Sequence, residues 1–273
     1  MRSIRPKFRN PPLIERAIGV VIEPLNDLSI GDYGLFWSEI IDEFPTSEAM
    51  DPVSAVMESF GSFRPSQVGI QLVSGGALPR AAFRNSLGGE LVQLQSDRFG
   101  FNWIKTDDDH KYPHSEATLD RFFELLARFS DYVERRDLGH VKIVQCELTN
   151  VNVVLVSDVG ESFADMATVL KLAPLEFDCD HIELENQMVG SKHLMLGDDG
   201  KPIGRVHTIG QPSLKVPNNE EAYRLDISAR GAPIGEGPEG ARRFFDVAVS
   251  AVNAVFLSSV TKAGRRFWGE IDG

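Results

Sequence analysis

The sequence predicts an α+β protein in which antiparallel meander sheets pack against long helices. Several runs of β-branched and aromatic residues are separated by short turn signals, which is typical of neighbouring antiparallel strands. Two long segments carry apolar residues at helical spacing. No glycine-rich phosphate loop follows a strand, and this disfavours a doubly wound nucleotide-binding fold.

The order of strand, helix, several strands and long helix occurs twice along the sequence. We therefore expect two pseudo-equivalent β-α-(β)n-α halves, which would amount to an internal duplication. A flexible basic arm is expected at residues 1–10, the first half at 11–139 and the second half at 140–273. The alternative is one integrated α+β domain, which a protein of 273 residues can also form.

In the first half, the helix at residues 115–136 is the clearest element, because its apolar residues recur on one helical face. Before it, turn signals at Gly88-Gly89 and at Ser96-Asp97-Arg98 divide residues 79–105 into a three-stranded meander. The other expected elements are a strand at 11–25, a helix at 31–45 capped by Asp32, a loop with a helical turn at 46–65 and a short strand at 67–75.

The second half is expected to begin with a valine-rich strand at residues 141–156. The closing helix at 239–268 is apolar on nearly all sides from Phe244 to Leu257, which predicts a deeply buried helix. Between them we expect a helix at 161–174, strands at 176–189 and 222–231, and a hairpin at 192–210 that turns at Asp198-Asp199-Gly200.

The composition excludes several classes of function. The formal net charge is −12 and the pI is near 5.0, which opposes binding to nucleic-acid phosphates. The basic side chains near the N-terminus are better explained as part of a solvated arm. The acidic balance would instead steer the protein toward a basic protein partner.

The two cysteines, Cys146 and Cys179, fit neither a disulfide framework nor a zinc ribbon, so each is expected as a buried reduced thiol. The N-terminus lacks the apolar stretch of a signal peptide. The longest apolar run contains Asp246 and Asn253 and is too short and too polar to span a bilayer. We expect a cytoplasmic protein without a membrane association.

Residues 92–114 are the densest stretch of polar and aromatic side chains, and alternation divides part of it into two rows. One row holds Phe99, Phe101 and Trp103, and we expect it to pack on the helix at 115–136. The other row lies on the opposite strand face and forms either an open display surface or a buried polar network. Its members are the first candidate binding residues: Gln93, Gln95, Arg98 and Asn102.

The same stretch contains three consecutive aspartates at 107–109, but consecutive side chains in a loop diverge, so they are unsuited to one cation. His110 and His114 have the spacing of a helical zinc motif. Pro113 lies between them and disfavours a helix there, so the two rings would not share a face. We therefore predict no metal site and no cofactor.

A second group of candidate residues lies in the predicted strand at 176–189. On such a strand His181, Glu183 and Glu185 would share one face, and Asp178 and Asp180 the other. Paired carboxylates can perform general acid–base chemistry or hold a cation. The alternative is the solvent face of a sheet edge that is guarded by like charges.

Three motifs together resemble a sporadically distributed family of uncharacterised bacterial proteins. They are N-P-P-L-I-E at residues 10–15, V-Q-L-Q-S-D-R-F-G-F-N-W at residues 92–103 with Tyr112-Pro113 nearby, and a C-terminal helix whose end near W-G falls at residues 261–269. The resemblance spans nearly the whole sequence and implies a coherent bacterial protein. The family has no assigned activity, so it carries over no catalytic residues. Its patchy inheritance suggests, by analogy alone, a bacterial conflict or defence setting.

Three functions remain open at this point. The first is a non-enzymatic interaction protein that presents an acidic surface to a protein partner, because no nucleophile, base or phosphate loop converges. The second is a small-molecule-binding protein with a cavity between the sheet and the C-terminal helix. The third is a metal-dependent hydrolase that uses His181, Glu183 and Glu185.

Overall fold

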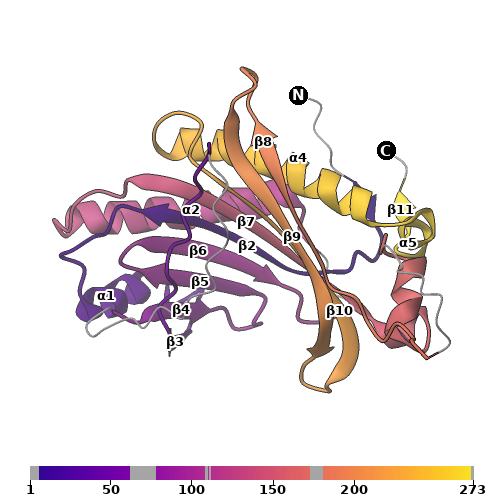
Figure 1. Ribbon diagram of the computed structural model, residues 1–273. Helices are drawn as coiled ribbons and strands as arrows, with labels where there is room; N and C mark the ends of the chain where they lie inside the picture. The colour runs from indigo at the N-terminus through magenta and orange to yellow at the C-terminus, as the bar shows by residue number, and fades with distance from the viewer. Residues whose placement is uncertain (1–5, 62–77, 108–109, 111, 173–180, 272–273) are drawn as a thin grey trace.

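The computed structural model describes residues 6–61, 78–107, 110, 112–172 and 181–271. Its main feature is a nine-stranded antiparallel sheet with the strand order β3-β4-β5-β6-β2-β7-β10-β9-β8 (Figure 1). This confirms the predicted α+β class. The strands are β2 (Leu13–Ile22), β3 (Thr46–Met50), β4 (Arg80–Arg84), β5 (Glu90–Gln95), β6 (Arg98–Ile104), β7 (Ile143–Leu155), β8 (Val189–Leu196), β9 (Pro202–Lys215) and β10 (Glu220–Gly231).

The helices are α1 (Ile30–Ile40), α2 (Ser115–Arg135), α3 (Val156–Val159), α4 (Gly237–Ser259) and α5 (Lys262–Phe267), with a 3-10 helix η1 (Phe163–Thr168). Helices α1, α2 and α4 pack on one face of this sheet, and α5 lies beside the short strand β11 (Glu270–Ile271) (Figure 1). The ring of Phe99 in β6 stacks on Phe129 of α2, with centroids 5.2 Å apart. Phe122 of α2 meets Phe245 of α4 at 5.6 Å, so one aromatic core joins the sheet and both long helices. Phe99 of the predicted aromatic row therefore packs on α2 as expected, whereas Trp103 contacts His110 and Tyr112, which precede that helix.

The two parts of the protein follow the same path through the sheet. The first long strand of each part, β2 or β7, lies in the middle, and the two pair with each other. Beyond β2 come β6, β5, β4 and β3, and beyond β7 come β10, β9 and β8. The expected boundary at residue 139 falls between α2 and β7. All nine strands belong to one sheet, and an internal duplication stays a prediction.

The start of α1 shows how a polar group is built into this core. Ser29 is the N-cap residue, and the carboxylate of Asp32, three residues later, accepts from the Ser29 backbone N–H at 2.9 Å. Asp32 therefore completes a capping box and is not itself the cap that the sequence predicts. Tyr132 of α2 donates to the second oxygen of Asp32 at 3.0 Å. Burial alone would raise the pKa of the Asp32 carboxyl, but the bonds from Ser29 and Tyr132 outweigh it and lower that pKa.

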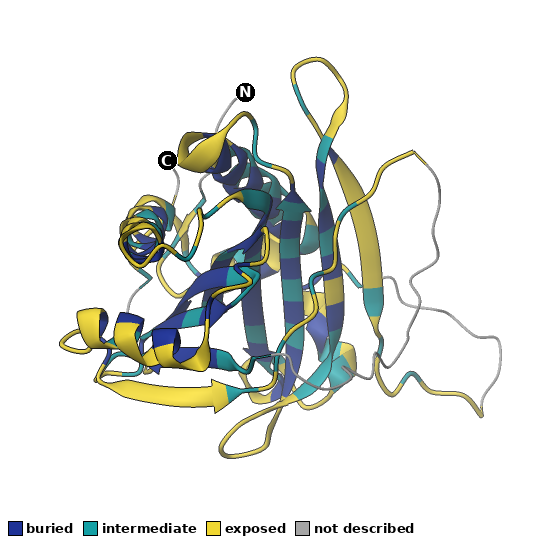
Figure 2. Cartoon of the chain, turned by 90° about the vertical axis from the view of Figure 1, so that its left-hand side faces the viewer, coloured by how far each residue is buried: buried dark blue, intermediate teal, exposed yellow. Residues whose placement is uncertain are grey.

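Several expected elements differ from the structure. Residues 46–50, expected as loop, form the exposed edge strand β3. Figure 2 shows this exposed strand and the alternating burial of residues along the central strands. The helix expected at 161–174 is replaced by η1 at its start, and Leu170 then bridges to Val260. That bridge holds Val260 in an extended conformation and ends α4 there, so the closing helix is split into α4 and α5.

The prediction of a strand at residues 176–189 is also wrong for residues 181–188, the part before β8 that the structure describes. Residues 181–188 have no strand structure and are largely exposed, and β8 begins only at Val189. The expected positions of Asp178, Cys179 and Asp180, and the short strand at 67–75, lie outside the described residues. Cys146 is a buried free thiol, as expected, and burial raises its pKa.

The N-terminal arm is paired in the part that the structure describes. Strand β1 (Lys7–Phe8) pairs with β11 (Glu270–Ile271), and the Arg9 N–H donates to the Gly269 carbonyl at 3.1 Å. Residues 7–10 are thus tied to the C-terminal segment and do not form the free arm that their charge suggests. Within the described ranges, every helix falls short of the length and apolarity that a bilayer span requires.

Candidate binding face

The sheet face opposite the helices carries polar side chains along most of its strands. Because alternate residues of a strand point to opposite faces, the pairing register places the whole predicted polar row on this side. We call it the polar face. It presents Glu48, Arg80, Arg84, Gln93, Gln95, Arg98, Asn102, Glu15, Gln145, Glu147, Thr149, Arg224, Asp226, Ser228, Arg230, Arg205, His207 and Lys192.

Four of these side chains form a run of hydrogen bonds across β4, β5, β6 and β2. Arg80 donates to Gln93 at 2.7 Å, and the Gln93 amide donates to Asn102 at 2.9 Å. Asn102 in turn donates to the carboxylate of Glu15. Glu15 belongs to the N-terminal motif and Asn102 to the central motif, so the fold brings the two motifs together. Two of the predicted residues, Gln93 and Asn102, are thus held in place by hydrogen bonds, whereas the Nε of Arg80 at the end of the run is buried without a hydrogen-bond partner among the described residues.

A second network lies across β6 and β7. Arg98 and Glu147 form an ion pair at 2.5 Å, and each side chain is only 16% exposed. The other Glu147 oxygen accepts from Gln145 at 2.9 Å. Gln95, the remaining predicted residue of the row, lies outside this network, at the end of β5, and donates to Asp97 in the following turn at 2.7 Å. These contacts hold the amides of Gln95 and Gln145 at defined positions on the face.

The polar face has the opposite charge balance to the protein as a whole. Its cationic side chains outnumber its carboxylates, although the net charge of the protein is −12. The cations are Arg80, Arg84, Arg98, Arg205, Arg224, Arg230 and Lys192, against the carboxylates Glu15, Glu48, Glu147 and Asp226. A face of this kind attracts anionic groups.

Residues 51–60, which we call the strap, cross this face without regular secondary structure (Figure 1). Two glutamines hold the backbone of the strap. Gln95 accepts from the Val53 N–H at 2.9 Å and donates to the Val53 carbonyl at 3.1 Å. Gln145 accepts from the Glu58 N–H at 2.9 Å and donates to the Val56 carbonyl at 2.9 Å. Each glutamine therefore acts as a two-point clamp on an extended backbone.

The strap ends on an acidic anchor at β9. The Glu58 side chain is only 6% exposed, and its carboxylate lies between Arg205, with which it forms an ion pair, and His207, whose Nε2 is 2.5 Å away. Arg205 also lies over the ring of Phe60, 5.1 Å from its centroid. Burial lowers the pKa of His207, and Arg230 and Lys192 act in the same direction, while Glu58 opposes them.

A hollow of about 160 Å³ lies on the polar face beside the strap. Its floor is low because Gly19 of β2 pairs with Gly100 of β6, and neither has a side chain. Its walls include Arg80, Arg98 and Val53. The hollow therefore leaves space on the polar face next to Val53, the strap residue that Gln95 binds.

The second predicted group is not brought together in the same way. His181, Glu183 and Glu185 lie on the exposed segment before β8, where a strand face does not align them. The described residues include no cluster of three His, Cys, Asp or Glu side chains suited to a metal ion. Asp107 accepts from the His110 backbone at 2.8 Å, and the His110 ring lies against Trp103. These groups build the turn that leads into α2.

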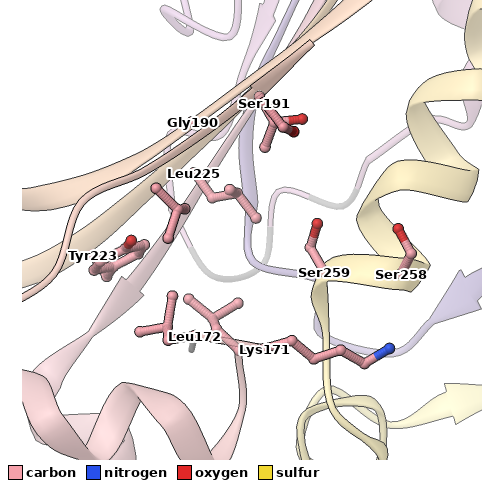
Figure 3. Close-up of a pocket in the computed structure, with 11 residues that line it drawn as sticks. Lys171, Leu172, Gly190, Ser191, Tyr223, Leu225, Ser258 and Ser259 are labelled. Carbon is pink, nitrogen blue, oxygen red and sulfur yellow. The ribbon is translucent and has the colours of Figure 1, made fainter. Parts of the chain in front are cut away.

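A separate cavity of about 200 Å³ lies between the sheet and the C-terminal end of α4 (Figure 3). Tyr223 and Leu225 of β10 line one side, and Ser258 and Ser259 line the other. The hydroxyls of Tyr223 and Thr208 are buried and have no hydrogen-bond partner within the described ranges. Burial raises the pKa of Tyr223 to about 12. The cavity lies between the sheet and the C-terminal helix, where the second sequence-based hypothesis requires one.

Comparison of the sequence with known protein families and with curated proteins gives no match.

Sequence reasoning did not find the strap, its anchor or the second clamp. Glu58 meets His207 over a separation of 149 residues, and Gln145 meets Val56 over 89. A usable signal was present in β7, where Gln145, Glu147 and Thr149 alternate with buried residues as the row in β5 and β6 does. No comparable signal marks the strap.

Proposed function

We propose that this protein is a non-enzymatic binding protein whose polar face binds an extended segment of a partner protein. The observation that carries the proposal is the pair of glutamine clamps, because Gln95 and Gln145 each bond a backbone N–H and a backbone carbonyl. Backbone groups are common to all proteins, so the two clamps by themselves place no requirement on the side chains of an extended segment. The strap supplies the geometry of the bound state.

This proposal keeps the expected protein partner but assigns it a different surface. The net charge suggests an acidic docking surface for a basic partner. The polar face instead has an excess of arginine, and its amides are already held by Asp97 and Glu147. A prearranged amide loses little conformational entropy on binding, which favours affinity.

The test uses a labelled peptide with the sequence of residues 51–60 and a protein in which Val53→Pro and Glu58→Pro weaken the strap. Proline has no N–H, so both clamps lose their strap donor. We expect the peptide to bind this variant, measured by fluorescence anisotropy. N-methylation of the peptide at the Val53 and Glu58 nitrogens should weaken binding about tenfold or more, because two hydrogen bonds of about 1 kcal/mol each are lost.

The matched control is the same peptide N-methylated at the Met57 nitrogen, which neither clamp uses. It should bind as tightly as the unmodified peptide. Equal weakening by both methylation patterns, or no weakening by either, would contradict recognition through the two clamps.

A second candidate function is favoured by the cavity at the end of α4. The hydroxyls of Tyr223 and Thr208, which have no partner in the part of the protein that the structure describes, are groups that a compact polar ligand would satisfy. A volume of 200 Å³ is small for a ligand pocket. A protein of this kind would bind a small molecule between the sheet and the C-terminal helix.

A Tyr223→Phe variant tests this cavity. We expect its thermal midpoint to be unchanged or raised by a few degrees, because the substitution removes a buried hydroxyl that has no partner among the described residues. Tyr132→Phe is the matched control and should lower the midpoint, because it breaks the bond to Asp32. A small molecule that stabilises the unchanged protein should stabilise Tyr223→Phe less. Equal stabilisation of both would remove Tyr223 from the ligand site.

A further inference from the structure

We infer that the partner segment is acidic, with an aromatic residue two positions after the carboxylate, and that the strap competes with it for the polar face. This inference rests on the proposed function and adds to it the class of partner and a built-in competitor. The strap has this pattern itself, because Glu58 is followed two residues later by Phe60.

The acidic preference comes from the anchor on β9. Arg205 and His207 point the same way because they are two residues apart on one strand, and both engage the Glu58 carboxylate. A carboxylate that is 6% exposed needs such partners, since a buried charge without them is strongly unfavourable. A neutral or basic side chain at this position would leave Arg205 facing it without a counter-charge.

The aromatic preference comes from the other side of the same arginine. The Phe60 ring lies 5.1 Å from the Arg205 guanidinium carbon, which is the distance of a cation–π contact. The Ser59 carbonyl also accepts from Arg205 at 3.3 Å. One arginine thus contacts a carboxylate, a backbone carbonyl and a ring in three consecutive residues.

The strap is bound to the face without being buried in it. None of the residues 51–60 is buried as a whole, and the large side chains of Val56, Met57 and Phe60 are exposed. The clamps, the anchor and the Phe60 contact are polar or cation–π interactions, so release of the strap uncovers little apolar surface. A partner segment needs the same amides and the same cations, and the face therefore cannot hold both at once.

Tethering gives the strap an advantage that a partner must overcome. A segment attached by a short linker acts at an effective concentration of about millimolar, so a free peptide of equal intrinsic affinity competes poorly at micromolar concentration. The intact protein is therefore expected to bind free peptide more weakly than a variant whose strap is disabled.

The experiment compares three full-length proteins with the labelled peptide of residues 51–60: the unchanged protein, Val53→Pro/Glu58→Pro, and the control Met57→Ala. Met57 is 52% exposed, and its side chain belongs neither to the clamps nor to the anchor. We expect the double-proline variant to bind about tenfold more tightly than the unchanged protein, or tighter still, and Met57→Ala to behave like the unchanged protein. Circular dichroism spectra should agree among the three.

The acidic anchor is tested in the double-proline variant. A peptide carrying Glu58→Gln should bind about tenfold more weakly than the original peptide, because it lacks the charge that Arg205 pairs with. Arg205→Gln in the receptor should weaken the original peptide to a similar extent and cause little further loss with the Gln peptide, because both changes remove one interaction.

Different failures point to different steps. Equal affinity of the unchanged protein and the double-proline variant, with binding still lost on Gln95→Ala/Gln145→Ala, overturns competition by the strap and leaves the proposed function in place. Equal affinity for the Glu and Gln peptides overturns the acidic preference. Absence of binding to the double-proline variant, or binding that Gln95→Ala/Gln145→Ala does not change, overturns the proposed function and this inference with it.

Discussion

A Phe129→Ala variant is expected to have a free energy of unfolding about 3–5 kcal/mol lower than that of the unchanged protein. Phe129 is fully buried in α2. Its ring stacks on Phe99 of β6 at 5.2 Å and meets the edge of Phe36 of α1, also at 5.2 Å. One residue therefore connects two helices and the sheet, and its truncation leaves a cavity that three rigid elements border.

The measurement is urea denaturation followed by circular dichroism, with the change read from the midpoint at constant slope. Leu87→Ala is the matched control, because Leu87 lies in the turn between β4 and β5 and is 83% exposed. It should change the free energy of unfolding by less than about 0.5 kcal/mol. A Phe129→Ala cost below about 1.5 kcal/mol would mean that α1 moves in to fill the space.

The position of Phe129 in the core was predictable from the sequence, and the reason is local. A helix shows its buried face through the spacing of its own apolar residues, and residues 115–136 carry that spacing without interruption. The hairpins were predictable for the same reason, because Gly88-Gly89 and Asp198-Asp199-Gly200 encode their turns within a few residues. The two polar glutamines of β5 were placed on the correct face by alternation alone.

The elements that were missed depend on distant partners. Residues 46–50 become a strand only because β4 offers an edge to them, and their own composition is not strand-like. The closing helix breaks at Val260 because Leu170, far earlier in the sequence, pairs with that position. Local propensity is a weak prior that such contacts override, and the predicted helix at 161–174 was lost in the same way.

The candidate site also has a part that was predictable from local sequence and a part that was not. The predictable part is the row of Gln93, Gln95 and Asn102, because these residues alternate with apolar ones along the sequence. The groups that make this row a candidate binding site come from the strap and from β9. No periodicity in the sequence connects Glu58 of the strap with Arg205 of β9, which are 147 residues apart. The strand predicted to align His181, Glu183 and Glu185 is missing from residues 181–188, because carboxylate-rich alternation also occurs in an exposed segment without a strand.

The ion pair at the middle of the polar face gives the second large expected effect. Glu147→Ala should lower the free energy of unfolding by about 3 kcal/mol, because breaking a largely buried pair leaves one charge without its partner. The Arg98 side chain, which is 16% exposed, would keep its charge without a counter-charge. Arg230 also lies close by, because the Nε of Arg230 is 3.9 Å from a Glu147 oxygen in the unchanged protein. The Gln145 amide would also lose an acceptor at 2.9 Å. Urea denaturation measures the change.

A double variant separates the ion pair from simple loss of packing. Arg98→Met/Glu147→Leu replaces both charges by apolar groups of similar size, and such replacements are often close to neutral. We expect it to recover most of the stability that Glu147→Ala loses. Thr149→Ala, on the same face of β7, controls for truncation of a residue whose hydroxyl bonds to Ser228 on the neighbouring strand. If the double variant is as unstable as Glu147→Ala, the loss of stability does not come from the unpaired charge. The contribution of Arg98 and Glu147 would then come from the packing of their side chains on the polar face.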